Sequence, residues 1–318
     1  MPNQLDVVTF GEVLALFAPT TAEPLRYARQ FELRWGGAEC NFAIALSRLG
    51  LRAGWQSLLG DDELGRLILN GARGEGVDVS RVRLVAGRPT GLYLKQFVAG
   101  TTQIFYYRAG SAASTLGPDD LDPSYLESAR WLHLTGITPA LSPSCRAAVE
   151  RAFELAGELG LRVSFDPNLR LKLWTIEQAR EVLIPLMQRC DVLLAGEEEL
   201  LPLLGLASRE EAVRAALDWG RPTLALKLGA EGALVASPTE RHAVPGLEVP
   251  TIVDTVGAGD GFDAGFVAGQ LMGWDLRASA ELGNAVGASA VGGRGDFEGY
   301  PTLAEAQAML EGRPIVAR

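Results

Sequence analysis

The feature that most constrains the fold is an alternation of short apolar runs with longer amphipathic segments along most of the chain. Apolar, β-branched runs of about four to eight residues are typical of buried strands, whereas the segments between them repeat apolar residues with helical spacing. Strands that alternate with helices predict a mainly parallel sheet with helices on both faces, a three-layer α/β/α fold. The runs expected to be strands are residues 5–10, 53–59, 131–135, 162–166, 191–195 and 222–228.

The segments expected to be helices follow these strands. A proline near the start and a glycine at the end bound the helix expected over residues 142–159. Residues 233–236 and 242–244 indicate a short antiparallel addition to the sheet. The other expected helices are residues 42–49, 61–72, 175–188, 197–204, 209–219, 258–272, 275–291 and 302–311.

Two segments, residues 13–35 and 89–112, interrupt the alternation. The second contains two strand-like runs, 90–98 and 102–108, around Ala99-Gly100, which predicts a hairpin. We expect the two segments to form a small β-rich lid over the sheet. Its apolar side chains, with Phe17, Phe31 and Tyr107 as candidates, suit a second subunit equally well, so a homo-oligomer is possible.

Composition excludes several classes of protein. A net charge of −10 argues against a nucleic-acid surface. No apolar run reaches the roughly 18 residues that a membrane span needs, and the N-terminus lacks the basic and apolar regions of a signal peptide. Three scattered cysteines predict free thiols in a reducing compartment. We therefore expect a cytoplasmic protein without membrane or nucleic-acid partners.

The stretch DTVGAGDGFDAGF at residues 254–266 is a glycine-rich turn that leads directly into an apolar helix. Glycines let backbone N–H groups approach an anion, and a helix N-terminus adds partial positive charge. Asp260 lies between two of the glycines and would repel a phosphate unless it accepts a proton from the group that attacks the phosphate.

Two other interpretations of this stretch stay open. Asp260 can be a simple helix cap. A dinucleotide-binding fingerprint of the form G-x-G-x-x-G is the other, but Phe262 takes the place of its last glycine. This mismatch disfavours a dehydrogenase.

Polar side chains follow the predicted strands where a parallel sheet binds its ligands. In the predicted hairpin, Tyr106 and Arg108 share one strand face, and an arginine in that position can bind a carboxylate. An exposed strand charge is the other interpretation of Arg108. The polar clusters are residues 11–12, 166–170, 227–232 and 257–260.

Two motifs together carry a resemblance to a known family. GGAECNFAIALSRLG at residues 36–50 resembles the first signature of the ribokinase-like (PfkB-type) sugar kinases, and residues 254–266 resemble the second. The likeness spans essentially the whole chain and implies a single ribokinase-like domain over residues 1–318. Within the family the sequence is most similar to 2-keto-3-deoxygluconate kinases, in residues 91–93, 105–111, 133–142, 166–174 and 294–299.

The resemblance implies ATP-dependent phosphorylation of the C6 hydroxyl of 2-keto-3-deoxygluconate, with Mg²⁺. Asp260 is then the catalytic base. The implied contacts to the sugar acid are Gly37, Tyr93, Tyr106, Arg108, Arg170, Asp260 and Asp296. The implied contacts to the nucleotide are Asn168, Arg170, Lys227, Gly229, Gly232, Gly257, Ala258, Gly259 and Asn284.

The sequence departs from the family at one place. Many relatives carry Asn-x-x-Glu after the strand at 191–195, where it organises magnesium and phosphates. Gly196 takes the place of the Asn and Glu199 is kept. Glu199 is therefore either an indirect metal ligand or a solvated acid in the first turn of a helix.

Other functions compete with this one. A fructokinase or a 5-keto-2-deoxygluconate kinase has the same fold, but a neutral sugar has little use for Arg108 beside Tyr106. A catalytically silent sugar or nucleotide sensor is the alternative from another class, and the intact turn at 257–260 argues against it. The sequence does not separate gluconate-derived from galactonate-derived epimers.

Overall fold

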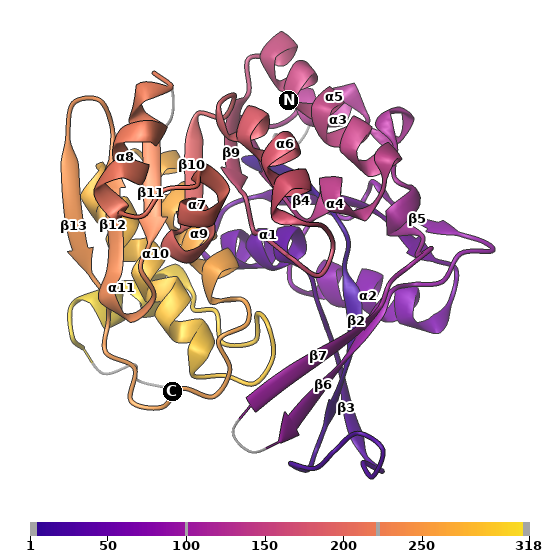
Figure 1. The fold of residues 1–318 in the computed structure, drawn as a ribbon. Helices are drawn as coiled ribbons and strands as arrows, with labels where there is room; N and C mark the ends of the chain where they lie inside the picture. The colour runs from indigo at the N-terminus through magenta and orange to yellow at the C-terminus, as the bar shows by residue number, and fades with distance from the viewer. Residues whose placement is uncertain (1–4, 99–100, 221–222, 314–318) are drawn as a thin grey trace.

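A computed structural model describes residues 5–98, 101–220 and 223–313. Its centre is a nine-stranded sheet with the order β13-β12-β11-β10-β9-β8-β1-β4-β5 (Figure 1). The strands are β1 (Val7–Phe10), β4 (Ala53–Gly60), β5 (Val82–Val85), β8 (Trp131–Thr135), β9 (Arg162–Asp166), β10 (Val192–Gly196), β11 (Thr223–Lys227), β12 (Gly232–Ala236) and β13 (Arg241–Pro245).

The strands from β11 to β5 pair in parallel, and β12 and β13 join the edge through antiparallel pairs. Both faces of the central strands are buried, so every residue of β4 is buried. Successive side chains of a strand point to opposite faces. In β10, Leu193 accordingly packs into one hydrophobic core and Leu194 into the other.

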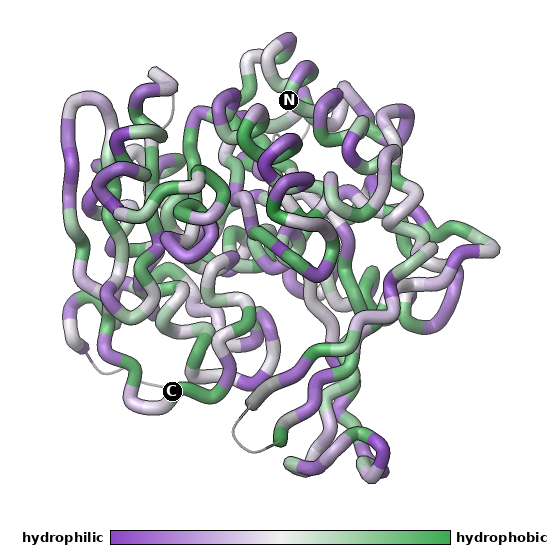
Figure 2. Tube along the Cα trace, viewed as in Figure 1, coloured by the Kyte–Doolittle hydropathy of each residue, from purple (hydrophilic) through white to green (hydrophobic). Residues whose placement is uncertain are grey.

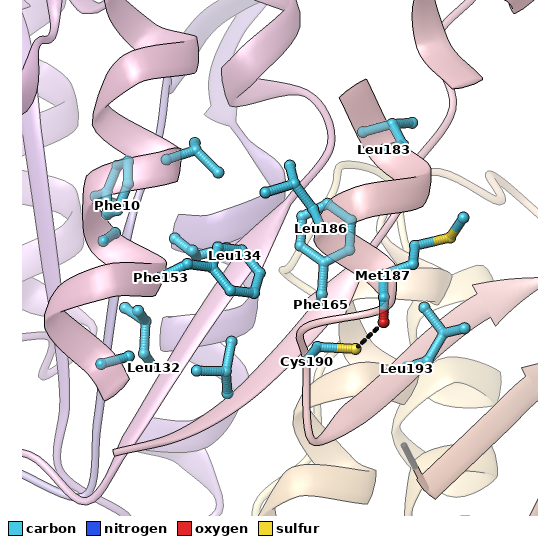
Figure 3. Packing of buried hydrophobic residues seen from close by; sticks show 14 of the residues in the cluster. Phe10, Leu132, Leu134, Phe153, Phe165, Leu183, Leu186, Met187, Cys190 and Leu193 are labelled. Carbon is cyan, nitrogen blue, oxygen red and sulfur yellow. Dashed lines mark hydrogen bonds between the residues drawn. The ribbon is translucent and has the colours of Figure 1, made fainter. Parts of the chain in front are cut away.

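Helices cover both faces, as the alternation predicts. One face carries α3 (Pro123–Glu127), α5 (Pro143–Leu159), α6 (Ile176–Met187), α7 (Glu197–Leu204) and α8 (Arg209–Asp218). Figure 3 shows Phe153 of α5 and Leu186 of α6 among the buried side chains of this core. The other face carries α1 (Ala38–Arg48), α2 (Glu63–Gly74), α9 (Ala258–Leu271), α10 (Leu276–Val291) and α11 (Leu303–Leu310).

Local signals explain where the predicted helices begin and end. The Ser142 side chain accepts a hydrogen bond from the N–H of Cys145 at the start of α5, with Pro143 in the first turn. Gly160 ends the same helix at φ 69°, a backbone conformation that favours glycine. These boundaries are the predicted ones.

A second sheet of four strands in the order β3-β2-β6-β7 projects from the main sheet (Figure 1). Its strands are β2 (Leu14–Pro19), β3 (Phe31–Gly36), β6 (Leu92–Val98) and β7 (Thr101–Tyr107). The predicted segments 13–35 and 89–112 supply all four, and β6 and β7 pair antiparallel as a hairpin requires. Its expected turn, Ala99-Gly100, lies outside the described residues. Figure 2 shows that the strands mix hydrophilic and hydrophobic residues.

The structure differs from the predicted elements in several details, among them the unexpected short helices α3 and α4 (Thr138–Leu141). The helix expected from residue 42 begins at Ala38. Its first turn contains Glu39, Cys40 and Asn41, and the burial of these side chains could not be predicted from their sequence. Strand β5 was not expected, since it lies at a sheet edge and its residues are exposed or half-buried. Within the described ranges, every helix is too short or too polar to span a membrane.

Candidate active site

A cavity of about 1220 Å³ opens at the carboxyl ends of the parallel strands. Glu12 follows β1, Asp166 ends β9 and Lys227 ends β11, and all three line it. The four-stranded sheet, called the lid below, lines the same cavity with Tyr93 and Tyr106. Ligands of open parallel sheets bind at this position, so the cavity is the candidate active site.

The N-terminus of α9 forms one wall of the cavity. Gly257 has φ 83°, and a Cβ atom there would lie 1.8 Å from the backbone oxygen of Asp296, so only glycine fits. The Tyr300 hydroxyl donates to the Gly257 carbonyl over 2.6 Å. The first N–H groups of a helix have no partner inside it. The turn Gly257–Asp260, called the cradle below, therefore presents N–H groups and a helix dipole to the cavity.

Asp260 lies in the first turn of α9 and lines the cavity. Asn41 Nδ2, from α1, donates to Asp260 Oδ2 over 2.8 Å. Burial raises the pKa of Asp260 and the carboxylate of Asp166 adds to the effect, whereas the Asn41 hydrogen bond opposes it. A carboxylate with a raised pKa is a better proton acceptor than an ordinary aspartate.

Lys227 lies next to the cradle, since a Cβ atom on Gly259 would be 3.6 Å from Lys227 Nζ. Its ammonium group contacts Asp166 Oδ2 and Asp263 Oδ1, each at 3.0 Å. Burial opposes the charged form, but these carboxylates raise the pKa of Lys227 above its ordinary value. The structure therefore holds one fixed positive charge next to the turn.

Glu199 lies near this group in the first turn of α7 and is half-buried. Its carboxylate accepts hydrogen bonds from the N–H groups of Leu169 at 3.0 Å and Gly196 at 3.3 Å. Burial raises the pKa of Glu199 to about 7, and Asp166 adds to the effect. Gly196 directly precedes α7. The Glu199 carboxylate caps the N-terminus of this helix by accepting the hydrogen bond from the N–H of Gly196.

Asn168 has a strained backbone, with φ 37° in the left-handed region. It is buried and lines the cavity. Within the part of the chain that the structure describes, its side-chain Oδ1 has no hydrogen-bond partner. A buried oxygen without a partner beside the cavity is suited to a ligand.

The lid contributes aromatic and basic side chains from two paired strands. Tyr93 and Tyr106 are directly opposite each other across β6 and β7, with ring centroids 5.7 Å apart. The Arg108 guanidinium lies 5.6 Å from the Tyr106 ring centroid, so the two share a face as the strand parity predicts. Arg108 Nε donates to Glu12 Oε2 over 2.6 Å, which fixes the orientation of the guanidinium.

Asp296 enters the cavity on the loop after α10. Tyr93 donates its hydroxyl to Asp296 Oδ2 over 3.0 Å, and Lys95 Nζ lies 3.3 Å from Oδ1. Burial raises the pKa of Asp296 to about 6, although Lys95 and Tyr93 oppose the shift. A Cβ atom on Gly36 would collide with this carboxylate, so the loop packs closely against the lid strand β3.

Most of the site residues expected from the sequence line this one cavity. They are Gly37, Tyr93, Tyr106, Arg108, Asn168, Arg170, Glu199, Lys227, Gly229, Gly257, Ala258, Gly259, Asp260 and Asp296.

Gly232 and Asn284 are not among the described residues that line the cavity. Asn284 Nδ2 donates to the Pro245 carbonyl over 3.0 Å. Gly232 lies against the same segment, because a Cβ atom there would be 2.2 Å from the Val244 oxygen. Their expected contact with a nucleotide stays a prediction, and their present contacts hold the end of β13.

Sequence reasoning missed the residues that hold the expected ones in place. Glu12 orients Arg108, Asn41 binds Asp260, and Asp263 binds Lys227. A signal existed for Glu12, which follows a buried strand, and for Asn41, which is part of the first motif. Asp263 occurs within an apolar helix, where a buried charge requires a partner.

The comparisons with known proteins agree with this geometry. The family model described as "pfkB family carbohydrate kinase" matches residues 4–303. The chain belongs to the pfkB family of carbohydrate kinases. Its large sheet with helices on both faces and its smaller second sheet are the ribokinase-like fold that the sequence predicts.

Curated members of the pfkB family match nearly the whole chain. The chain is 41% identical over 312 residues to the 2-dehydro-3-deoxygluconokinase of Thermoproteus tenax, covering 96% of this chain and 94% of that protein. It is 40% identical over 317 residues to the enzyme of the same name from Bacillus subtilis, covering 98% of both. Fructokinase-1 of Zea mays is 37% identical over 320 residues, covering 96% of this chain and 97% of that protein.

Solved structures of pfkB-like kinases superpose closely on this fold. The 2-dehydro-3-deoxygluconokinase of Thermotoga maritima has a TM-score of 0.89 and 31% identity, and the match covers 97% of this chain and 99% of that one. A ribokinase II of E. coli, solved in complex with ATP and Mg²⁺, has a TM-score of 0.92 and 26% identity, covering 97% and 100%.

Proposed function

We propose that this protein transfers the γ-phosphoryl group of ATP to the C6 hydroxyl of 2-keto-3-deoxygluconate, which is also called 2-dehydro-3-deoxygluconate. The observation that carries the proposal is the lining of one cavity. It combines the Asp260 carboxylate, whose pKa is raised and which lies in an anion-binding turn, with two arginines, Arg108 and Arg170. Two relatives at 40–41% identity carry the name of this activity. A phosphate-binding turn and a carboxylate-binding pair are what a sugar-acid kinase requires.

The proposed chemistry needs few groups. Asp260 accepts the proton of the C6 hydroxyl as that oxygen forms a bond to the γ-phosphorus, and the bond from phosphorus to the β–γ bridging oxygen breaks to release ADP. N–H groups of the cradle stabilise the charge that develops on the transferred group. Lys227 adds a fixed positive charge next to the turn.

The carboxylate of the substrate explains the basic residues at the other side of the cavity. Glu12 uses part of the Arg108 guanidinium, and the remaining N–H groups are available to a ligand. Arg170 is exposed on the opposite loop and lines the same cavity. We assign Arg108 to the substrate carboxylate, and Arg170 to either this carboxylate or a phosphate.

We propose ATP as the phosphoryl donor and Mg²⁺ as its companion ion. Mg²⁺ prefers oxygen ligands and keeps several waters, so it needs few protein groups. Two groups fit: the Asn168 Oδ1, which lacks a partner within the described residues, and the Glu199 carboxylate. We propose that both hold the ion through its waters. The ion supplies charge neutralisation for the phosphates.

A fructokinase is the second candidate, because Fructokinase-1 of Zea mays is also similar along the whole chain. A neutral ketose offers no partner for the guanidinium of Arg108, which would then be a buried charge with Glu12 alone. The two arginines of the cavity therefore favour the sugar acid.

A phosphorylation assay tests the proposal. The purified protein is supplied with ATP, Mg²⁺ and, in separate reactions, 2-keto-3-deoxygluconate, its galactonate epimer, 5-keto-2-deoxygluconate and fructose. We expect fastest ADP formation with 2-keto-3-deoxygluconate, and a ³¹P signal of a primary phosphate ester in the product. Faster turnover of fructose would replace the assignment with a fructokinase. Absence of turnover with every sugar would favour the silent sensor.

A further inference from the structure

A buried lysine of the lid lies between two carboxylates of the main body. The Lys95 side chain is 1% exposed, and its Nζ lies 2.6 Å from Asp254 Oδ2 and 3.3 Å from Asp296 Oδ1. Lysines are almost never fully buried unless they are paired. The two carboxylates come from loops on either side of α9 and α10, so this ammonium group links the lid to two separate parts of the body.

Tyr93 strengthens the same link. It precedes Lys95 by two residues on β6, so the two side chains point to the same face of the lid. Tyr93 donates to one oxygen of Asp296 and Lys95 contacts the other. The lid therefore holds both oxygens of this carboxylate.

The two carboxylates are connected to the cradle through the backbone. Asp254 Oδ1 accepts a hydrogen bond from the N–H of Val256 over 3.2 Å, which shapes the turn just before Gly257. The backbone oxygen of Asp296 lies 1.8 Å from the position that a Cβ atom of Gly257 would take, so the two segments are in close contact. A displacement of either carboxylate would therefore move the backbone that forms the cradle.

We propose that Lys95 is a positioning residue through which the lid holds the cradle in its reactive shape. When the lid moves away from the body, the carboxylates of Asp254 and Asp296 lose the contact with the Lys95 ammonium group and repel each other. The turn is then ordered for phosphate transfer only while the lid covers the sugar. This coupling limits ATP hydrolysis by water when no sugar is bound. The proposal rests on the kinase function proposed above, but not on which sugar is the substrate.

Lys95→Ala tests the link through chemical rescue. We expect kcat to fall at least about tenfold with only a small change in the KM of the sugar, because the cradle and not the sugar contact is disturbed. Propylammonium has the length of the deleted part of the side chain, and we expect it to restore most of the lost kcat. Tetramethylammonium chloride at the same concentration is the control for ionic strength, since this ion is too bulky and donates no hydrogen bonds.

A matched variant separates this effect from damage to the lid. Gln96 is the next residue on β6, points to the opposite face, and binds Leu25 and Gln103. We expect Gln96→Ala to keep kcat close to that of the wild type, with no response to propylammonium.

A second variant covers the case in which Lys95→Ala does not fold. Lys95→Ala combined with Asp254→Asn removes one positive and one negative charge, so the buried group keeps the net charge of the wild type. We expect this protein to fold and still to show the lower kcat, because the link between lid and turn is absent. A double variant with the kcat of the wild type would overturn the proposal.

The remaining outcomes are also decisive. A folded Lys95→Ala protein whose kcat is close to that of the wild type, or that ignores propylammonium, would overturn the positioning role. If the wild type phosphorylates a different sugar, the substrate assignment fails and the Lys95 comparison is run with that sugar. If the wild type phosphorylates none, both proposals fail together.

Discussion

The two walls of the cavity differ in how they hold their charged groups. On the body wall, the carboxylates of Asp166 and Asp263 are buried, and both contact the ammonium group of the half-buried Lys227. On the lid wall, Tyr106 is 38% exposed and Arg108 is bound to a single carboxylate. The charged groups of the body wall are paired with one another before any ligand arrives, whereas the Tyr106 ring of the lid wall is exposed to solvent.

This difference assigns different tasks to the two walls. Transition-state stabilisation requires groups that do not reorganise during the reaction, which the paired charges of the body provide. Recognition of a substrate gains from groups that lose water when the substrate covers them. We therefore place phosphoryl transfer on the body wall and recognition of the sugar acid on the lid wall.

Asp260→Asn removes the proposed base from the body wall and keeps its shape. We expect kcat to fall at least about 10²-fold, the lower range for general base catalysis, while the KM values of sugar and ATP change little. Steady-state kinetics with both substrates varied measures this. A variant with nearly normal kcat would show that Asp260 only caps the helix.

Glu39→Gln tests the burial of charge behind the body wall. Glu39 accepts hydrogen bonds from Thr135 and Thr138, and burial raises its pKa to about 7. An acid whose pKa is higher in the folded state than in the unfolded state stabilises the fold while it is protonated. For Glu39 this stabilisation is complete below the ordinary pKa of 4.5 and is lost as the pH rises to about 7. Neutral glutamine does not ionise, so we expect the variant to gain about 2 kcal/mol over the wild type between pH 5 and pH 8.

Urea unfolding of both proteins at the two pH values gives this difference. Glu63→Gln is the matched control, because the Glu63 side chain is 96% exposed, and we expect it to behave like the wild type. If the difference in the free energy of unfolding between Glu39→Gln and the wild type is the same at both pH values, Glu39 is not a buried, ionisable group.

Arg108→Lys changes the lid wall. Lysine keeps the charge but cannot bind a carboxylate with two parallel N–H groups, nor keep the contact with Glu12 in the same geometry. We expect the KM of the sugar acid to rise about tenfold and the KM of ATP to change little, since one charged hydrogen bond contributes about 1.5 kcal/mol. Equal increases in both KM values would remove Arg108 from the sugar side of the cavity.

Asn41→Ala adjusts the base without removing it. The Asn41 amide donates to Asp260 and favours its ionised form, so its loss raises the pKa of Asp260 further. The base works only when ionised, so kcat falls as the pH drops through this pKa. We expect the acid limb of the kcat profile to move to higher pH, with little change on the alkaline side. A profile that does not move would argue that another group titrates.

The sequence predicts the body better than the lid for a physical reason. The elements of the body follow from local periodicity, and Ser142 and Gly160 mark the ends of a helix through contacts within a few residues. The two segments of the lid were recognised because they break that periodicity. The partner of Lys95, in contrast, lies 159 residues away, and no local pattern shows such a contact.

The sequence predicts the position of the site but not the burial of its residues. Residues within the two motifs and after the strands lie around one cavity, because parallel strands bring their carboxyl ends together. Burial was not predictable, since it depends on the whole fold. Glu199 has the sequence position of an exposed helix acid, but it is half-buried and its carboxylate accepts backbone hydrogen bonds. Asn284 is bound to backbone carbonyls away from the cavity lining.

We propose that the lid binds the carboxylate of the substrate and that the body transfers the phosphoryl group. The most direct test is the ratio of kcat/KM for 2-keto-3-deoxygluconate to that for fructose, measured with the wild-type protein at equal ATP and Mg²⁺. A site built to bind a polar group rejects an analogue without it, so we predict a ratio of at least about 10². A ratio near one, or a preference for fructose, would contradict the account.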